Sequence, residues 1–176
     1  MAKNHRRHSL TPEGLSVERI EIGPEKIVAV TRSRCRTSCC PSCGHASSRI
    51  HSRYQRLLAD LPAHGRPVEI MVMVRRFRCS RPSCPRTIFA ERLNKSIAVA
   101  SARRTARMES VVHGLGLALG GRPGHSLAER LAIPVSKDTL FANRSSPSRS
   151  PDLAAARSGY RRLGVAPRLS IRNCCL

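Results

Sequence analysis

The chain has 176 residues, enough for one ordinary domain or two small ones, and only 3% are aromatic. This composition disfavours one large hydrophobic core and favours small modules. Lysine and arginine number 32 against 11 acidic residues, giving a formal net charge of +21, which indicates a polyanionic partner such as nucleic acid or, second, an anionic membrane surface. No apolar run is long enough to span a membrane, and no apolar stretch follows the basic start as in a secretory signal. We expect a cytoplasmic, nucleoid-associated protein, in a reducing compartment where clustered cysteines bind metal more often than they form disulfides.

The first hundred residues read as strands and loops. Four segments have strand character: 17–22, 26–31, 67–78 and 87–90. Gly23-Pro24 between the first two predicts a hairpin. Residues 35–48 have the composition of a loop, and residues 53–61 show no clear preference. The strongest strand is 67–78, whose alternate apolar residues predict one buried face: Val68, Ile70, Val72 and Val74.

Helical character begins after residue 100. Three segments are expected to be helices: 102–119, 126–131 and 137–141. Gly120-Gly121 predicts the end of the first helix, Pro134 breaks the second, and Ser136 is a good N-cap for the third. From about residue 142 no periodicity persists, and the Ser, Pro and Arg content is typical of disorder.

The cysteines form two chelating pairs. Cys40 and Cys43 make a Cys-x-x-Cys motif, and Cys79 and Cys84 make a Cys-x4-Cys motif beyond a β-rich stretch. Two such pairs, each on a tight turn, supply the four thiolates of a closed structural Zn²⁺ site with no open position for catalysis. The sequence therefore predicts a structural zinc ion held by these four residues.

Other ligands remain open at this stage. Cys39-x3-Cys43 and Cys35-x3-Cys39 are competing spacings, and the Pro-x-Cys-Gly turn favours Cys40 with Cys43. Three histidines are alternative donors, each more typical of a surface position: His45, His51 and His64. A redox role for the Cys-x-x-Cys motif is disfavoured because a helix normally follows such a motif, and residues after Cys43 lack helical period.

Two groups of residues are candidate DNA contacts. Around the cysteines, basic side chains offer phosphate contacts from Arg53, Arg75, Arg76 and Arg78, with Phe77 expected on the opposite strand face in a small core. Segments 126–131 and 137–141 have the spacing of a helix-turn-helix, which predicts contacts from Ser136, Lys137 and Thr139. Arg103 and Arg104 precede this unit and could add phosphate contacts; a solvated charged face is the alternative.

Several ordered motifs resemble the N-terminal part of insertion-sequence transposases of the ISL-three type. They are Cys40-Pro-Ser-Cys-Gly, Ser48-Arg-Ile-His-Ser-Arg-Tyr54, Asp60-Leu-Pro62, Val74-Arg-Arg-Phe-Arg-Cys79, Cys84-Pro-Arg, Ile88-Phe-Ala-Glu-Arg92, Thr105-Ala-Arg, Gly116-Leu-Ala-Leu-Gly-Gly121 and Val135-Ser-Lys-Asp-Thr-Leu140. The resemblance covers about residues 15–141. It implies a zinc finger and a helix-turn-helix that bind the terminal repeats of the element, followed by an RNase-H-like catalytic domain with metal-binding carboxylates.

The chain departs from that pattern at its end. The only acidic residue after Asp138 is Asp152, whereas a two-metal phosphoryl-transfer site needs several converging carboxylates. Residues 159–172 are compatible with codons whose next frame reads Gly-Ile-Asp-Asp, similar to the start of the family's catalytic domain. We therefore hypothesise a frameshift near Phe141; an evolved basic tail is the alternative.

These observations predict an α+β chain in four parts. They are a flexible N-terminus (1–14), a zinc-ribbon-like domain (15–95), a helix-turn-helix segment (100–141) and a disordered, out-of-frame tail (142–176). The expected function is binding of double-stranded transposon-end DNA without catalysis, with intact transposase as a second partner. The alternatives are an RNA-binding zinc protein, a four-cysteine redox or electron-transfer protein with iron, and a transposase whose catalytic part is supplied by an accessory frame.

Overall fold

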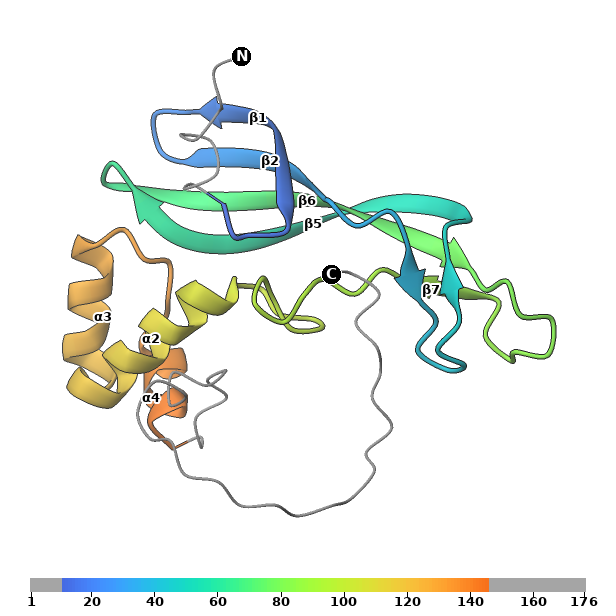
Figure 1. The fold of residues 1–176 in the computed structure, drawn as a ribbon. Helices are drawn as coiled ribbons and strands as arrows, with labels where there is room; N and C mark the ends of the chain where they lie inside the picture. Colours follow the sequence, from blue (N-terminus) through green and yellow to red (C-terminus); the bar gives the residue numbers. More distant parts are fainter. Residues whose placement is uncertain (1–10, 146–176) are drawn as a thin grey trace, which may run out of the picture.

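The computed structural model describes residues 11–145 and has a mixed α+β fold (Figure 1). Its strands are β1 (Leu15–Ile22), β2 (Ile27–Ser33), β3 (Ser38–Cys39), β4 (Ala46–Ser47), β5 (Ile50–Ala63), β6 (Arg66–Arg78) and β7 (Ile88–Ala90). Its helices are α2 (Ala106–Leu119), α3 (Gly121–Arg130) and α4 (Lys137–Ser145). Residues 1–10 of the expected flexible start lie outside the described residues. So do residues 146–176 of the tail that is expected to be disordered and out of frame.

Five strands form the main sheet, in the order β1-β2-β6-β5 with β7 on the end of β6. Strands β1 and β2 are the predicted hairpin. Strand β2 pairs parallel with β6, whereas β5 and β7 pair antiparallel with it. The short strands β3 and β4 form a separate hairpin inside the segment expected to be a loop. Strand β6 is thus the centre of the sheet, as its strong apolar pattern indicates.

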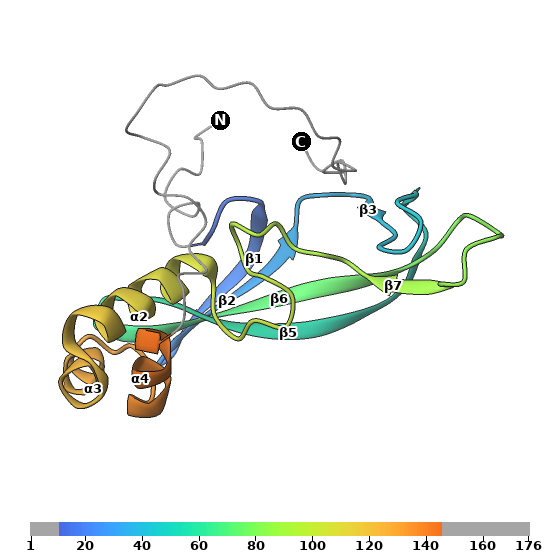
Figure 2. The same cartoon turned by 90° about the horizontal axis from the view of Figure 1, so that it is seen from below.

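Strands β5 and β6 form one long hairpin that runs the length of the molecule. They are joined at His64 and Gly65, both with positive φ, 52° and 70°, the conformation of a type I′ turn. Figure 2 shows the helices at one end of this hairpin and β3 and β7 at the other. The sequence gives β5 no clear preference because it carries exposed charged residues; pairing with β6 makes it a strand.

The main core lies on one face of β6. Val68, Ile70, Val72 and Val74 are all buried there, which confirms the predicted face. They pack with Leu15, Leu58, Ile97 and Ala98. Ile97 and Ala98 come from the connection between β7 and α2, which crosses beneath the sheet in Figure 1. That connection closes the core and carries the chain from the cysteine-bearing end to the helices.

The helices begin and end where local capping dictates. Helix α2 begins at Ala106, four residues later than predicted, because the Thr105 hydroxyl accepts a hydrogen bond from the N–H of Met108 at 3.3 Å. Helix α3 begins at Gly121, five residues earlier than predicted. Pro123 is tolerated in its first turn because the N–H groups there lack intrahelical partners.

Helix α4 begins at the predicted Lys137. The Ser136 hydroxyl accepts the N–H of Thr139 at 3.3 Å, as expected for an N-cap. The helix continues to Ser145, four residues beyond its predicted end at Phe141.

The three helices share a second core. Its buried residues are Met108, Val112, Ala128, Ile133, Val135 and Leu140, with Leu61 of β5 packed against them. None of the helices in the part of the chain that the structure describes is long and apolar enough to cross a membrane. The helical unit is therefore a small packed body attached to the end of the β5–β6 hairpin.

Candidate metal centre and nucleic-acid interface

Four thiols meet at the end of the sheet opposite the helices. The sulfur atoms of Cys40, Cys43, Cys79 and Cys84 all lie within 4.8 Å of one another. Cys40 Sγ lies 3.8 Å from Cys84 Sγ, and Cys43 Sγ lies 3.6 Å from Cys79 Sγ. A disulfide would bring two sulfurs to about 2.05 Å, so these are four free thiols.

The separations fit a tetrahedral metal ion. A tetrahedron with zinc–sulfur bonds of about 2.3 Å has sulfur–sulfur edges of about 3.8 Å, close to the two distances measured between the pairs. Four soft sulfur donors select zinc or iron over magnesium or calcium. With four protein ligands no coordination position remains for a substrate, so the ion would be structural.

Each pair of cysteines occupies the turn of a hairpin. Cys40 and Cys43 lie between β3 and β4, where the Gly44 N–H donates to the Cys40 carbonyl at 2.8 Å. Gly44 has a φ of 71°, a left-handed conformation that glycine adopts without strain. Cys79 and Cys84 lie between β6 and β7, and the Cys79 N–H donates to the Thr87 carbonyl at 2.8 Å.

The two turns are held together by the strands that flank them. The Ser47 hydroxyl donates to the Arg78 carbonyl at 2.6 Å, and the Arg78 N–H donates to the Arg49 carbonyl at 2.8 Å. Next to these bonds, Ile50 of β5 pairs with Phe77 of β6. The β5–β6 pairing therefore brings together two cysteine pairs that are far apart in the sequence.

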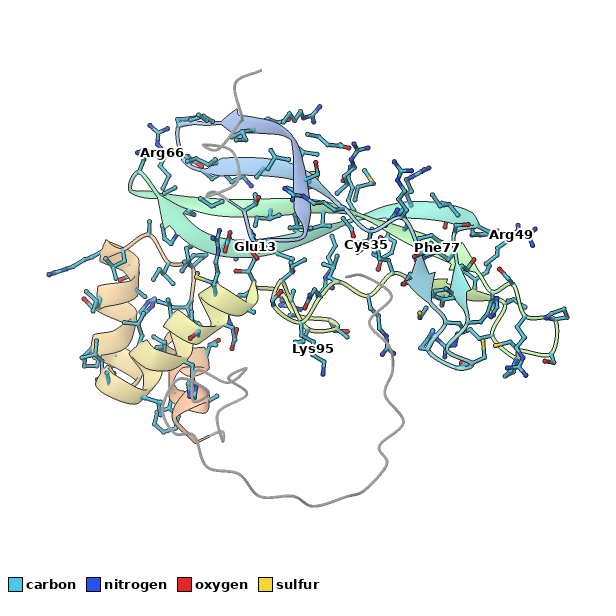
Figure 3. The ribbon with its side chains drawn as sticks, in the orientation of Figure 1. Glu13, Cys35, Arg49, Arg66, Phe77 and Lys95 are labelled. Atoms are coloured by element: carbon cyan, nitrogen blue, oxygen red, sulfur yellow. The ribbon has the colours of Figure 1, made fainter. Side chains whose placement is uncertain are left out.

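A small aromatic core supports the thiols. Phe77 and Phe89 are buried with Cys40, and their ring centroids are 5.9 Å apart. In Figure 3 the labelled Phe77 lies beside the sulfur atoms at this end of the sheet. Strand β6 buries Val74 on one face and Phe77 on the other, so it serves the main core and the metal centre in turn. The expected place of Phe77 in a small core is confirmed.

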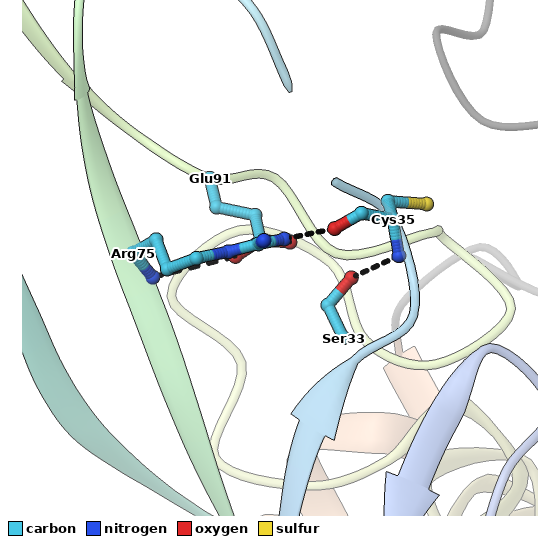
Figure 4. A network of polar contacts seen from close by, with 4 residues as sticks. All are labelled: Ser33, Cys35, Arg75 and Glu91. Atoms are coloured by element: carbon cyan, nitrogen blue, oxygen red, sulfur yellow. Dashed lines mark hydrogen bonds and ion pairs between the residues drawn. The ribbon is translucent and has the colours of Figure 1, made fainter. Parts of the chain in front are cut away.

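Arg75 contacts this core at Phe77 and is held in place by Glu91. Its Nη2 and Nε donate to the two carboxylate oxygens of Glu91 at 2.6 and 2.9 Å, and Nη2 also donates to the Cys35 carbonyl (Figure 4). The guanidinium lies 5.2 Å from the ring centroid of Phe77. Arg75 is therefore a bidentate partner of a buried carboxylate, a role that the sequence did not indicate.

The cysteine thiols have different pKa values when no cation is bound. Burial alone would raise the pKa of Cys40, but hydrogen bonds from the Cys43 and Ser42 N–H groups lower it to about 7. At Cys79 the Arg81 N–H lowers the pKa, but burial and the neighbouring thiols together raise it to about 12. Four thiolates cannot coexist here without positive charge, which a bound divalent metal supplies.

The competing ligands lie outside this cluster. Cys35 and Cys39 are disulfide-bonded and do not join the four thiols. His45, His51 and His64 are exposed, and none is part of the group. Cys43 is followed by β4 rather than by a helix, unlike a redox Cys-x-x-Cys motif.

The predicted DNA contacts fall at both ends of the molecule. Arg53, Arg76 and Arg78 are exposed near the metal centre, and the Arg76 guanidinium lies 4.9 Å from the ring centroid of Tyr54. Arg103 is exposed beside the helices, whereas Arg104 forms an ion pair with Glu109 at 3.3 Å. At the start of α4, Lys137 is exposed and the Ser136 and Thr139 hydroxyls hydrogen-bond each other at 2.9 Å.

Residues 36–85 match a transposase zinc finger. The matching family is described as the zinc-finger of transposase IS204/IS1001/IS1096/IS1165. The matched stretch contains all four clustered cysteines and covers less than a third of the chain. No curated protein and no solved structure matches this chain. The sheet region thus carries a zinc ribbon, and the family match and the four close cysteines are consistent with structural zinc.

Proposed function

We propose that this chain binds the terminal DNA of a transposable element through its zinc ribbon and its helical unit. The observation that carries the proposal is the cluster of Cys40, Cys43, Cys79 and Cys84 inside the stretch that matches a transposase zinc finger. The four cysteines are the proposed zinc ligands. Zinc would hold the two turns in place, and DNA contacts would come from the surface around them.

The charge around the ribbon supports a DNA partner. Arg53, Arg76 and Arg78 are exposed there, and so are Arg49, Arg81 and Arg86. Figure 3 shows Arg49 directed outward at this end of the molecule. Exposed arginines in such density favour phosphate contacts, which position a protein on DNA and make its affinity depend on salt. Arg75 is not among these exposed arginines: Glu91 accepts hydrogen bonds from its Nε and Nη2, so Arg75 would offer a phosphate chiefly its Nη1.

The helical unit is the proposed base-reading element. Helices α3 and α4, joined by residues 131–136 with a turn at Leu131 and Ala132, and backed by α2, have the order of a helix-turn-helix. Helix α4 would enter the major groove with its N-terminus first, where Lys137 is exposed and Ser136 and Thr139 form the cap. Arg103 and Arg104 would contact the DNA backbone beside it.

We further propose that this chain does not cut or join DNA. Among the residues that the structure describes, the cysteine cluster is the only His, Cys, Asp or Glu group that could hold a metal. The two buried acids, Asp60 and Glu91, are each bound to an arginine. Such a chain would act in the cytoplasm at the nucleoid, and could occupy the binding sites of an intact transposase or assemble with it.

The frameshift hypothesis concerns residues from about 142, of which 146–176 lie outside the described part. The nucleotide sequence downstream of the Phe141 codon tests it. A neighbouring frame that encodes the acidic motif would support it, and its absence would refute it. The same frame would also reveal whether an accessory product supplies a catalytic part.

The DNA proposal is tested by fluorescence anisotropy with a labelled duplex that carries the ends of the host element. We expect specific binding that weakens steeply with salt and is lost on Cys40→Ser, because the variant lacks a complete metal site. Equal or tighter binding to a structured RNA of the same charge would favour the RNA-binding alternative. Binding that survives Cys40→Ser unchanged would show that the ribbon is not required.

The identity of the bound metal distinguishes a structural zinc site from the redox alternative. Zinc with four thiolates is colourless because its d shell is full, whereas an iron–thiolate site absorbs visible light. We expect purified protein to be colourless and to contain one zinc ion per chain by elemental analysis. A coloured protein containing iron would support the electron-transfer alternative.

A further inference from the structure

An arginine-lined pocket lies at the end of β2, beside β1 and β6. It has a volume of about 340 Å³ and is lined by Ser16, Arg32, Ser33, Arg34, Cys35, Arg36 and Arg75. This is at the lower end of the range of small-ligand pockets, about 300–1,000 Å³. None of its lining residues belongs to the metal cluster or to the helical unit.

The end of β2 builds this pocket. Arg32 lies in β2 opposite Ser16 of β1, and the chain then continues through Arg34 and Arg36 toward β3. The Arg34 N–H donates to the Gly14 carbonyl at 3.0 Å. All five residues from Arg32 to Arg36 line the pocket, and three of them are arginines, so positive charge is concentrated along one stretch of backbone.

The fourth arginine fixes the other wall. Arg75 of β6 donates to the Cys35 carbonyl, which ties the segment leaving β2 to the centre of the sheet (Figure 4). The Cys35 N–H in turn donates to the Ser33 hydroxyl at 3.3 Å. Because that bond occupies a lone pair of the oxygen, the Ser33 O–H remains a donor. The pocket is thus held in shape by contacts that do not need a ligand.

The charge balance of the pocket is positive. Four arginines and no carboxylate line it. Acids outside the pocket pair with Arg75 and Arg32: Glu91 with Arg75, and Glu18 at 3.5 Å from Arg32 in a pair exposed on both sides. The Arg32 pair is weak because solvent screens it. For Arg75, no partner of Nη1 is found among residues 11–145, so two of its N–H groups are available.

We propose that this pocket binds a phosphate group of the DNA backbone, as a contact separate from the zinc ribbon and the helical unit. Several guanidinium groups and a hydroxyl donor suit phosphate oxygens, which arginine recognises by paired hydrogen bonds. No aromatic side chain lines the pocket, so nothing there stacks a base. This inference rests on the proposed function and names a third point of attachment for the same DNA.

The test uses a variant matched for charge. Arg32→Gln/Arg36→Gln removes two positive charges from the pocket. Arg19→Gln/Lys26→Gln removes two from the same β1–β2 hairpin outside it, at side chains that are 68% and 52% exposed. Binding of a labelled 30-base-pair duplex of arbitrary sequence is measured from about 50 to 200 mM salt. Each phosphate contact contributes roughly 0.9 to the slope of log K against log salt.

We expect the pocket variant to reduce that slope by about 1, because one phosphate contact is lost, and the control variant to leave it within about 0.5. Zinc content and melting temperature are measured to show that both variants are folded. An unchanged slope in a folded pocket variant, with wild-type binding intact, would overturn the pocket assignment and leave the DNA-binding proposal standing.

A second arm uses inorganic phosphate alone. Thermal unfolding is compared in phosphate and chloride at equal ionic strength. We expect weak stabilisation by phosphate that Arg32→Gln/Arg36→Gln abolishes and the control retains. If the wild-type protein binds no duplex yet is stabilised in this way, the pocket is a site for free phosphate, and both its DNA source and the proposed function are wrong.

Discussion

The carboxylate of Asp60, buried in β5, accepts a hydrogen bond from the hydroxyl of Thr105 at 2.6 Å. Thr105 is also the N-cap of α2. Arg107 binds the same carboxylate through Nε, at 2.8 Å, and through Nη2. The backbone adds two bonds, from the Ala59 N–H to Arg103 and from the Thr105 N–H to Ala59. The Asp60 carboxylate, together with these backbone bonds, therefore fixes the helical unit to the sheet.

We predict that Asp60→Ala lowers the free energy of unfolding by about 3 kcal/mol, because removing one partner of a buried ion pair leaves the other uncompensated. Urea unfolding followed by circular dichroism measures this. Glu21→Gln is the control: Glu21 pairs with Arg19 at 2.7 Å with both side chains more than half exposed, and should cost less than about 1 kcal/mol. Equal losses in the two variants would contradict the prediction.

Arg75 should not be replaceable by lysine. Arg75→Lys loses the two-pronged bond to Glu91 and the contact over Phe77, so we expect a loss of about 2 kcal/mol. Lys26→Arg is the control, since Lys26 pairs with Glu69 at 2.8 Å on the surface. It should change stability by less than about 0.5 kcal/mol. Chemical denaturation measures the free energy of unfolding of both variants. An unchanged value for Arg75→Lys would contradict the prediction.

Zinc removal should unfold one end of the molecule only. The aromatic core of Phe77 and Phe89 depends on the cysteine turns, whereas the main core and the helical core contain none of the four ligands. After chelation we expect fast hydrogen exchange in residues 38–47 and 79–90 and continued protection in α2. Global loss of protection would show that the three cores are not independent.

The ligand choice has its own test. Cys40→Ser should lose the bound zinc, because three thiolates remain at a site built for four. Cys39→Ser should keep one zinc ion per chain, since Cys39 lies outside the cluster. Metal content of the two purified proteins decides between them. Zinc lost from Cys39→Ser and kept in Cys40→Ser would reverse the assignment.

Replacing each of two glycines of the helical unit with alanine should change the stability in opposite directions. Gly114 in α2 has nothing within 4 Å of an added Cβ, so Gly114→Ala should stabilise by about 1 kcal/mol through helix propensity. At Gly124 in α3 an added Cβ would lie 3.3 Å from Cδ1 of Leu140, which is fully buried and cannot yield. Gly124→Ala should therefore destabilise by about 1 kcal/mol. Melting temperatures that move in the same direction would contradict this.

Structural features that depend on a few neighbouring residues could be predicted from the sequence. The alternation in β6, the β1–β2 hairpin at Gly23-Pro24 and the cap at Ser136 each depend on a few neighbouring residues, and the structure has them. The cysteine pairs belong to the same class, because each pair lies on one turn. Local chemistry was enough for these.

Long-range partners could not be predicted in this way. Asp60 and Arg107 are 47 residues apart, and Arg75 and Glu91 are 16 apart; nothing near either arginine indicates its carboxylate. Strand β5 is likewise defined by its pairing with β6 rather than by its own pattern. The alternating arginines 32, 34 and 36 were visible in the sequence, but only the fold places Arg75 beside them.

The β5–β6 hairpin sets a distance. Ile50, opposite Phe77, marks the zinc end, and Asp60, which holds the helices, comes ten residues later on the same strand. At about 3.3 Å per residue this separates the two by roughly 30 Å, close to one turn of B-form DNA at 34–36 Å. The hairpin thus fixes the spacing between the ribbon and the helices. If both bind DNA as proposed, they would contact the same side of a duplex about ten base pairs apart. Half a turn of extra DNA between their two contacts would put one of them out of reach.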